Sequence, residues 1–89
     1  MNNRETNTKT IRVKLDYPLE QVKEPIIYHL VIDYHLVPNI RRANIDSHIG
    51  GMMALEIEGA PDDLEAGVEF LRGLGITVTT VGLEQAWTI

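Results

Sequence analysis

The residues of this chain that could do chemistry are three histidines, one serine and several pairs of acidic residues. His29 and Asp33 are four residues apart, so their side chains can meet if the segment is helical. His35 would project away from that pair, and His48 lies much further along the chain. Because the paired-histidine spacing of zinc sites is missing and there is no cysteine, we expect no metal site and no cofactor.

The acidic pairs and the serine do not form a catalytic pattern either. Ser47, the only serine, has no nucleophile-elbow arrangement of glycines around it. Glu56 and Glu58 occupy alternate positions of a predicted strand, and Asp62 and Asp63 suit the first turn of a helix. No phosphate-binding glycine motif is present. We therefore expect a domain that is not an enzyme.

Composition sets further bounds on the protein. A chain of 89 residues has room for one domain with a modest core, and a net charge of −5 argues against binding nucleic acid. No apolar run is long enough for a signal peptide or a membrane span, so we expect a cytoplasmic domain without membrane insertion. We predict a disordered arm at residues 1–8, the domain at 9–82 and a tail at 83–89 that carries Trp87.

The first half of the chain predicts a strand, a helix and a second strand. Ile11, Val13 and Leu15 alternate with polar residues, which is typical of a half-buried strand. A helical pattern runs from about Glu20 to His35, or from Lys23 or Glu24 if Pro25 lies in the first turn. Its apolar stripe comprises Val22, Ile26, Ile27, Leu30, Val31 and Tyr34. The next strand spans residues 39–49. Its apolar residues can share one inward face only if a one-residue bulge lies near Arg41 and Arg42.

The second half predicts a hairpin, a helix and a last strand. Gly50-Gly51 is a hairpin turn signal, and the strand after it points Met53, Leu55 and Ile57 inward. Pro61 begins a helix whose apolar stripe comprises Leu64, Val68, Leu71 and Leu74. Gly67 on that stripe indicates close approach of the helix to the sheet, and Gly75 ends the helix. Residues 76–81 form the fourth strand.

The element order is therefore β-α-β-β-α-β. This order predicts an α+β fold, the ferredoxin-like sandwich, with a four-stranded antiparallel sheet in the order 4-1-3-2 and both helices on one face. The second strand would then be an edge strand, a natural site for pairing between subunits. RNA-binding domains of the same order need aromatic residues on the two central strands, and none stands on those outward positions here.

The first helix has a second flank that is not wholly polar. Tyr28, Ile32 and His35 lie beyond the core stripe. Tyr28 and Ile32 are either packed at the helix–sheet margin or exposed as a surface for a protein partner, since exposed apolar patches mark contacts.

Three stretches around the second and third strands form a more specific pattern: Asn39-Ile40, Ala43-Asn44-Ile45-Asp46 and Gly51-Met52-Met53-Ala54-Leu55-Glu56-Ile57-Glu58-Gly59. This pattern resembles the NIL domain, a family named for an Asn-Ile-Leu-type motif at the start of the second strand. Here the motif reads Asn39-Ile40-Arg41, so its third residue differs. With Phe70-Leu71-Arg72 before Gly75, the resemblance covers residues 9–81.

The resemblance implies a fold like that of ACT regulatory domains, and a homodimer that binds methionine. Members are attached to the ATPase of methionine ABC importers, where they inhibit transport, or to iron–sulfur ferredoxin modules, or stand alone. Without cysteines and without an ATPase, this chain is similar to the freestanding kind, which would act in trans on a partner.

In the transporter domains the ligand lies near the start of the second strand, which implies ligand-binding roles for Asn39, Ile40 and Arg41. An amino acid offers a carboxylate and an ammonium, and a bulge, an asparagine and an arginine can meet both. Alternatively, Asn39 caps a turn after Pro38 and the arginines are solvated. The competing function is a protein-interaction adaptor without a small-molecule ligand.

Overall fold

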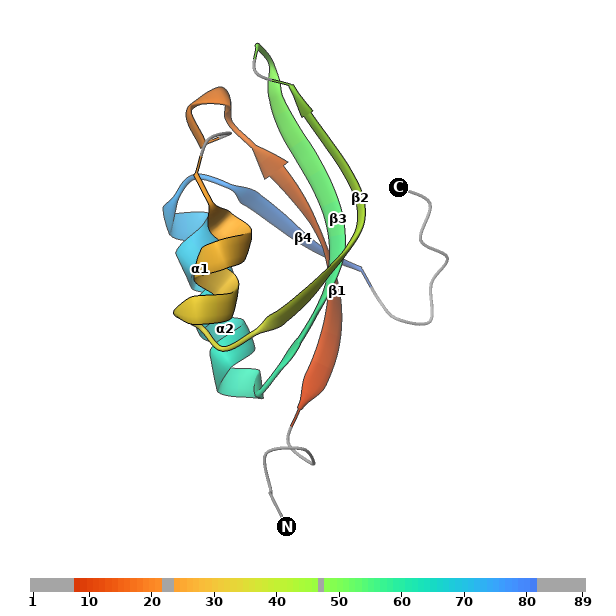
Figure 1. Ribbon diagram of the computed structural model, residues 1–89, viewed down its shortest axis with the longest axis vertical. Coiled ribbons are helices and arrows are strands. Elements are labelled where there is room, and N and C mark those ends of the chain that lie inside the picture. The colour runs from red at the N-terminus through yellow and green to blue at the C-terminus, as the bar shows by residue number, and fades with distance from the viewer. Residues whose placement is uncertain (1–7, 22–23, 47, 82–89) are drawn as a thin grey trace.

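The computed structural model describes residues 8–21, 24–46 and 48–81. Its elements are β1 (Lys9–Tyr17), a 3₁₀ turn η2 (Leu19–Gln21), α1 (Ile26–Ile32), β2 (Val37–Asp46), β3 (Gly50–Gly59), α2 (Pro61–Gly73) and β4 (Thr77–Val81). The four strands form one antiparallel sheet in the order β2-β3-β1-β4, and both helices lie on the same side of it (Figure 1). The predicted ferredoxin-like order 4-1-3-2 is confirmed. The predicted arm and tail lie outside the described residues, apart from Thr8.

The core lies between the sheet and the two helices. On the sheet side it contains Val13, Leu15, Leu55 and Ile57, all at most 1% exposed, as the alternation of apolar residues predicts. On the helix side it contains Ile26, Leu30, Leu36, Leu64 and Leu71. Burying such side chains is the main favourable contribution to the stability of a domain this small.

The first helix is much shorter than predicted. It begins after Pro25, whose missing N–H cannot continue a helical ladder, and it ends at Ile32. Leu19–Gln21, which the prediction places at the start of the helix, form a 3₁₀ turn, and Val22 of the predicted stripe lies outside the described residues. Val31, which the stripe places in the core, is 43% exposed, whereas Ile26 and Leu30 are buried, so the buried face of the helix is narrower than predicted.

The hairpin between β2 and β3 also differs from the prediction. The turn lies before the two glycines and is stabilised by Asp46. Oδ1 of its carboxylate accepts a hydrogen bond from the backbone N–H of His48 at 2.7 Å, as in an Asx turn. Gly50 and Gly51 instead begin β3. Gly50 has φ +121°, and a Cβ there would lie 2.6 Å from the backbone oxygen of Tyr17. At Gly51 a Cβ would collide with the side chain of Ile45.

The second helix follows the prediction closely. Pro61 is its first residue, and Gly75, with φ +84°, follows the C-cap Leu74. The close approach at Gly67 is also present, although its partner is not the sheet. A Cβ at Gly67 would lie 2.6 Å from Cδ1 of Leu36, which follows α1, and 3.4 Å from Cδ2 of Leu30.

Candidate functional site

The start of β2 is shaped by the predicted bulge. The pairing of β2 with β3 shifts register between Ile40 and Arg42, which leaves Arg41 as the extra residue. Ile40 pairs with Leu55 and Ala43 pairs with Met53, so both face the helices although they are three residues apart. The bulge thus gives β2 one continuous helix-side face and places Arg41 at the irregularity.

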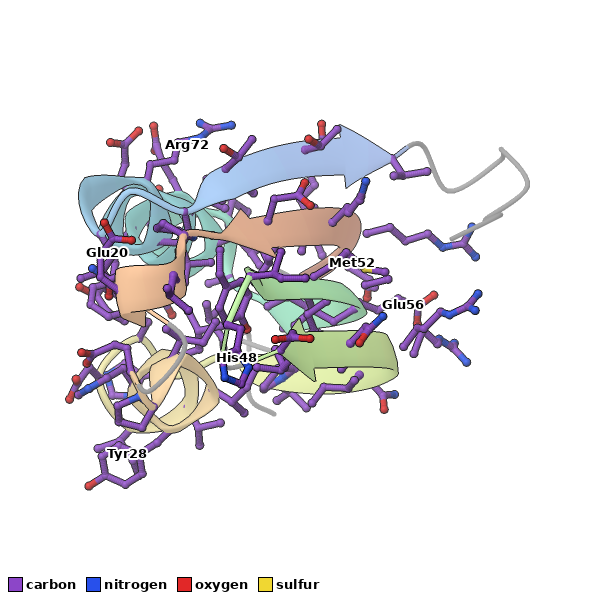
Figure 2. All side chains as sticks on the ribbon, turned by 90° about the horizontal axis from the view of Figure 1, so that it is seen from above. Glu20, Tyr28, His48, Met52, Glu56 and Arg72 are labelled. Atoms are coloured by element: carbon purple, nitrogen blue, oxygen red, sulfur yellow. The ribbon has the colours of Figure 1, made fainter. Side chains whose placement is uncertain are left out.

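The carboxylate of Glu56 lies at the centre of the outer sheet face beside this bulge (Figure 2). Its two oxygens accept hydrogen bonds from Arg41 at 3.0 Å and from Nε of Arg12 at 3.1 Å. The Glu56 side chain is only 17% exposed. The hydrogen bond from Arg41 lowers the pKa of Glu56; the bond from Arg12 and both positive charges act in the same direction, and partial burial opposes them. One carboxylate therefore connects β1, β3 and β2.

The three residues predicted to bind a ligand are separated by the pleat. Asn39 pairs with Glu56 in the register, so it lies on the outer face together with that carboxylate. Arg41 reaches the same carboxylate from the bulge. Ile40 lies on the opposite, helix-facing side and is 48% exposed. The structure thus places Asn39 and Arg41 together around Glu56 and directs Ile40 away from them.

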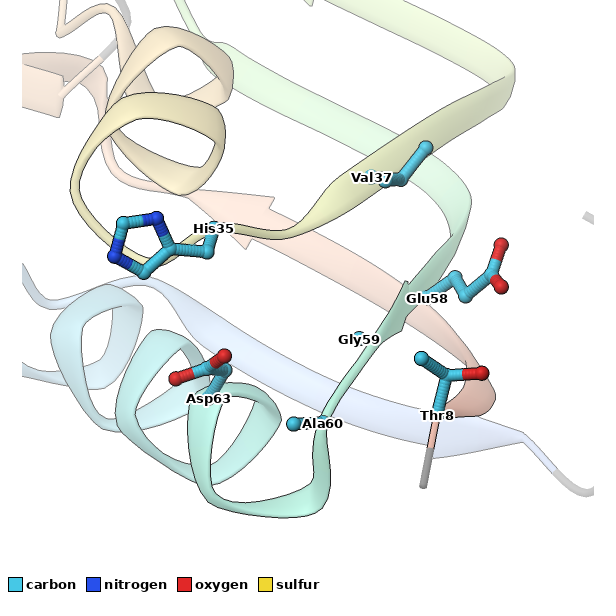
Figure 3. A pocket seen from close by; sticks show the side chains of 7 residues that line it. All are labelled: Thr8, His35, Val37, Glu58, Gly59, Ala60 and Asp63. Carbon is cyan, nitrogen blue, oxygen red and sulfur yellow. The ribbon is translucent and has the colours of Figure 1, made fainter. Parts of the chain in front are cut away.

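Two neighbouring hollows lie at this end of the sheet. A shallow one of about 100 Å³ is lined by Thr10, Val37, Asn39, Glu56 and Glu58. A larger one of about 350 Å³ is lined by Thr8, His35, Val37, Glu58, Gly59, Ala60 and Asp63 (Figure 3). The two hollows share Val37 and Glu58. Ligand pockets commonly measure about 300–1,000 Å³, so only the larger one has the size for a small molecule.

The larger hollow depends on an unusual backbone conformation after α1. His35 has φ +58°, a left-handed conformation that is uncommon for residues other than glycine, although asparagine, aspartate and histidine adopt it more often than most. It reverses the chain, so that Leu36 enters the core with 2% exposure and Val37 begins β2. In Figure 3 the His35 ring and the Asp63 carboxylate stand on opposite sides of the space between this turn and α2. The sequence did not predict that His35, Val37, Glu58 and Asp63 line this hollow, because the hollow depends on a turn that has no clear sequence signal.

His29, the histidine predicted to lie beside a carboxylate, contacts two acidic side chains. His29 Nδ1 lies 2.9 Å from Asp33 Oδ2, the predicted pair, and its Nε2 lies 3.3 Å from Glu24 Oε1. The ring also packs edge-on against Phe70 of α2, with centroids 5.6 Å apart. Within the described ranges no three His, Asp or Glu residues come together as a group that could hold a metal ion. His29 thus has a structural role in joining the two helices.

The flank of α1 is exposed, which argues against one of the two interpretations of Tyr28 and Ile32. Their exposed fractions are 59% and 53%, so they do not pack at the helix–sheet margin. With Val31 they form an apolar strip on the outside of the helix, and Tyr28 projects on the side of the molecule where β2 is the edge (Figure 2). We call Tyr28, Val31 and Ile32 the α1 strip.

Comparison with known proteins identifies relatives of this fold. The model of the NIL domain family matches residues 11–80. Among solved structures, the chain is similar to the C-terminal domain of an ABC transporter ATP-binding protein from Enterococcus faecalis, with 30% identity and a TM-score of 0.72. That similarity covers 83% of this chain and 86% of the other. A search of the curated proteins finds no match. None of the helices in the described part of the chain is long and apolar enough to cross a membrane. The match over most of its length shows that this chain belongs to the NIL domain family.

Proposed function

We propose that this protein is a regulatory, ligand-sensing domain that binds a small amino acid such as methionine and acts in trans on a partner protein as a homodimer. Family membership supports a regulatory rather than a catalytic role, and the similar domain from Enterococcus faecalis belongs to an ABC transporter ATP-binding protein. The observation that carries the ligand part is the 350 Å³ hollow next to Asn39, the first residue of the motif.

The lining of this hollow suits one end of an amino acid. Glu58 and Asp63 supply carboxylates, which attract an ammonium group, and Val37 and Ala60 supply apolar surface for a side chain. A ligand carboxylate would be repelled by both acids, and Glu58 also lines the hollow on the Asn39 side, so the carboxylate would need the positive charge of Arg41. Since Arg41 already contacts Glu56, a ligand carboxylate would have to compete with Glu56 for that guanidinium. We infer modest affinity for this reason.

Calorimetry and thermal unfolding with L-methionine test this proposal. A ligand that binds only the folded state at one hundred times its dissociation constant stabilises it by about 2.7 kcal/mol. We expect Glu58→Gln and Asn39→Ala to weaken the binding, and Thr79→Ala on the far edge strand to leave it unchanged. No heat and no rise of the melting temperature at millimolar methionine would overturn the ligand part.

The second candidate is an adaptor that binds a protein and no small molecule. The exposed α1 strip favours it, because Tyr28 and Ile32 present apolar surface that nothing covers among the described residues. This function predicts capture of one specific partner that is lost with Tyr28→Ser and kept with Asn39→Ala. Loss of that partner with Asn39→Ala but not with Tyr28→Ser would favour the ligand-sensing function instead.

A further inference from the structure

The outer edge of β4 lacks the features that usually protect an edge strand. β4 pairs with β1 on one side, and within the described residues no strand lies on its other side. Prolines, bulges and charged side chains commonly keep such an edge from pairing further. β4 reads Thr-Val-Thr-Thr-Val and contains none of them, whereas β2 contains Pro38, the bulge at Arg41 and several charges. The backbone of β4 is therefore suited to accept another strand.

A contact from α2 shows which backbone groups of β4 point outward. Nη2 of Arg72 donates a hydrogen bond to the backbone oxygen of Val78 at 3.3 Å. Arg72 is exposed and lies beside β4, on the side of the molecule opposite Tyr28 (Figure 2), so it reaches this oxygen from the open edge. In an antiparallel strand every second residue directs both its N–H and its C=O to the same side. Thr80, two residues further on, therefore also presents both groups at the open edge.

A small hollow between α2 and the end of β4 lies next to these groups. Its volume is about 260 Å³. This is below the range of about 300–1,000 Å³ that is common for small-molecule pockets, so it suits one side chain better than a whole ligand. Its lining combines the apolar side chains of Ile11, Leu64 and Val68 with the carboxylates of Glu65 and Glu69.

The hollow exists because α2 covers only part of the helix-facing side of β4. Val78 and Thr80 pair with Leu15 and Val13, two core residues, so both side chains lie on the helix side of the sheet. Val78 is 7% exposed, whereas Thr80 is exposed and lines the hollow. A strand added beside β4 would therefore find space for a side chain at the position opposite Thr80.

We propose that an extended segment of a partner protein pairs antiparallel with the outer edge of β4, with an apolar residue opposite Thr80 and a basic residue two positions before it. Strand addition to a sheet edge is a recurring mode of peptide recognition. The apolar residue would exchange two backbone hydrogen bonds with Thr80 and direct its side chain into the hollow. This contact rests on the partner required by the proposed function, and it is independent of methionine and of the α1 strip.

The direction of α2 places the basic residue. Arg72 contacts Val78, whereas Leu64 shares the hollow with Thr80, so α2 runs opposite to β4 along the groove. In an antiparallel segment, the residues that precede the apolar one lie beyond Thr80, on the Glu65 side. A lysine or arginine two positions before the apolar residue shares its face and meets an opposite charge there. At the other end of the groove the same residue would be repelled by Arg72.

Charge also favours a separate partner over other occupants of the groove. The rim carries the carboxylates of Glu65 and Glu69, which attract a basic segment. Residues 82–89 of this chain include Glu84 and contain no lysine or arginine. The β4 strand of a second copy carries no charge at all. Neither segment matches the acidic rim, whereas a basic and apolar segment does.

Titration of the full chain with a synthetic peptide, without methionine, tests strand addition. The probe is a capped threonine peptide of seven residues with lysine at its second position and isoleucine at its fourth. We expect it to slow hydrogen exchange of the Val78 and Thr80 amides, and to leave that of Asn44 on the other edge strand unchanged. Methylation of the isoleucine nitrogen should abolish binding, because this N–H faces β4, whereas methylation of the preceding nitrogen should not. Equal binding of the two methylated peptides, or no binding of the parent peptide at millimolar concentration, overturns the proposal.

A charge swap tests the acidic rim. Glu65→Lys should weaken binding of the lysine peptide about three- to tenfold, the size expected from exposed ion pairs, and should strengthen binding of the same peptide with glutamate instead of lysine. Glu20→Lys makes the same change of charge on η2, outside the groove, and should alter neither affinity appreciably. Both substituted residues are exposed, and circular dichroism checks that both variants fold. An unchanged preference for the lysine peptide in Glu65→Lys contradicts the assigned contact.

Further measurements separate this contact from the proposed function and from other occupants. Asn39→Ala and Tyr28→Ser should bind the peptide as the wild type does, whatever they do to methionine or to an adaptor partner. Loss of peptide binding in either variant would place the contact elsewhere and refute the assignment to β4. Tighter binding of a peptide with the sequence of residues 82–89 would make that segment the occupant. Self-association that Glu65→Lys abolishes in sedimentation would make a second copy the occupant, and either result overturns the proposal.

Discussion

The contact between Leu36 and Gly67 makes a quantitative prediction about what holds the helices against each other. Leu36 is 2% exposed, and its Cδ1 occupies the place where a side chain at Gly67 would begin, 2.6 Å from an ideal Cβ. On an otherwise open helix, replacing glycine by alanine stabilises by about 1 kcal/mol. Here the added methyl overpacks the core, which commonly costs about 1–3 kcal/mol. We therefore expect Gly67→Ala to leave the free energy of unfolding unchanged or to lower it by up to about 2 kcal/mol.

The sign should reverse when the leucine is removed. Leu36→Ala alone is expected to lower the free energy of unfolding by about 2–5 kcal/mol, the range for a buried leucine. In that background the methyl of Gly67→Ala enters the vacated space, so the helical preference of alanine is no longer opposed. Gly67→Ala should then stabilise by about 1 kcal/mol. The expected coupling between the two sites is thus about 1–3 kcal/mol.

Urea denaturation of the four proteins in this double-mutant cycle measures the coupling. Gly73→Ala is the matched control, because it lies in the same helix and an added Cβ would have no atom within 4 Å. It should be neutral or slightly stabilising, and by the same amount, in both backgrounds. If Leu36→Ala is too unstable to measure, Leu36→Val provides a milder truncation. Equal effects of Gly67→Ala with and without Leu36 would refute the argument that these two residues compete for one space.

Three further predictions concern single residues. Glu56→Gln should make the fold less sensitive to acid. Because the pKa of Glu56 lies below its ordinary value of 4.5, the ionised carboxylate stabilises the fold above that pH, and this stabilisation is lost as pH falls through the folded-state pKa. Unfolding titrations of both proteins below pH 5 measure the difference. Burial raises the pKa of Tyr17 from 10.0 to about 12, so stability should fall by up to about 3 kcal/mol as pH rises from 10 to 12, and Tyr17→Phe should show much less of this loss. Gly50→Ala should lower the melting temperature, by a destabilisation of about 1–3 kcal/mol, because φ is +121° and the methyl would meet backbone; an unchanged melting temperature would contradict this.

Regular elements and topology were predictable because each follows a periodic pattern. The inward residues of β1 and β3, the start of α2 at Pro61 and the order of the strands all follow from apolar spacing and from proline and glycine signals. Even the bulge was predictable, because Ile40 and Ala43 could not otherwise share a face.

The failures lie where a single residue outweighs the pattern. Pro25 shortened α1, and one carboxylate of Asp46 placed the hairpin turn ahead of Gly50 and Gly51. The hollow beside β2 escaped prediction because it depends on the left-handed His35, a backbone conformation that side-chain type does not reveal. The partner of Arg41 was equally hidden, since the contact with Glu56 depends on the cross-strand register.

The position of Glu56 between two arginines has a consequence for how information could cross the sheet. Its carboxylate connects the central strands to the β2 edge, and Arg12 would keep it paired if Arg41 were drawn away. Releasing Arg41 therefore leaves no buried charge without a counter-ion, which removes one electrostatic cost of moving the bulge. The sheet interior would stay fixed while its rim moves. Binding at the β2 edge could then change the rim of the sheet without disturbing the core that keeps the domain folded.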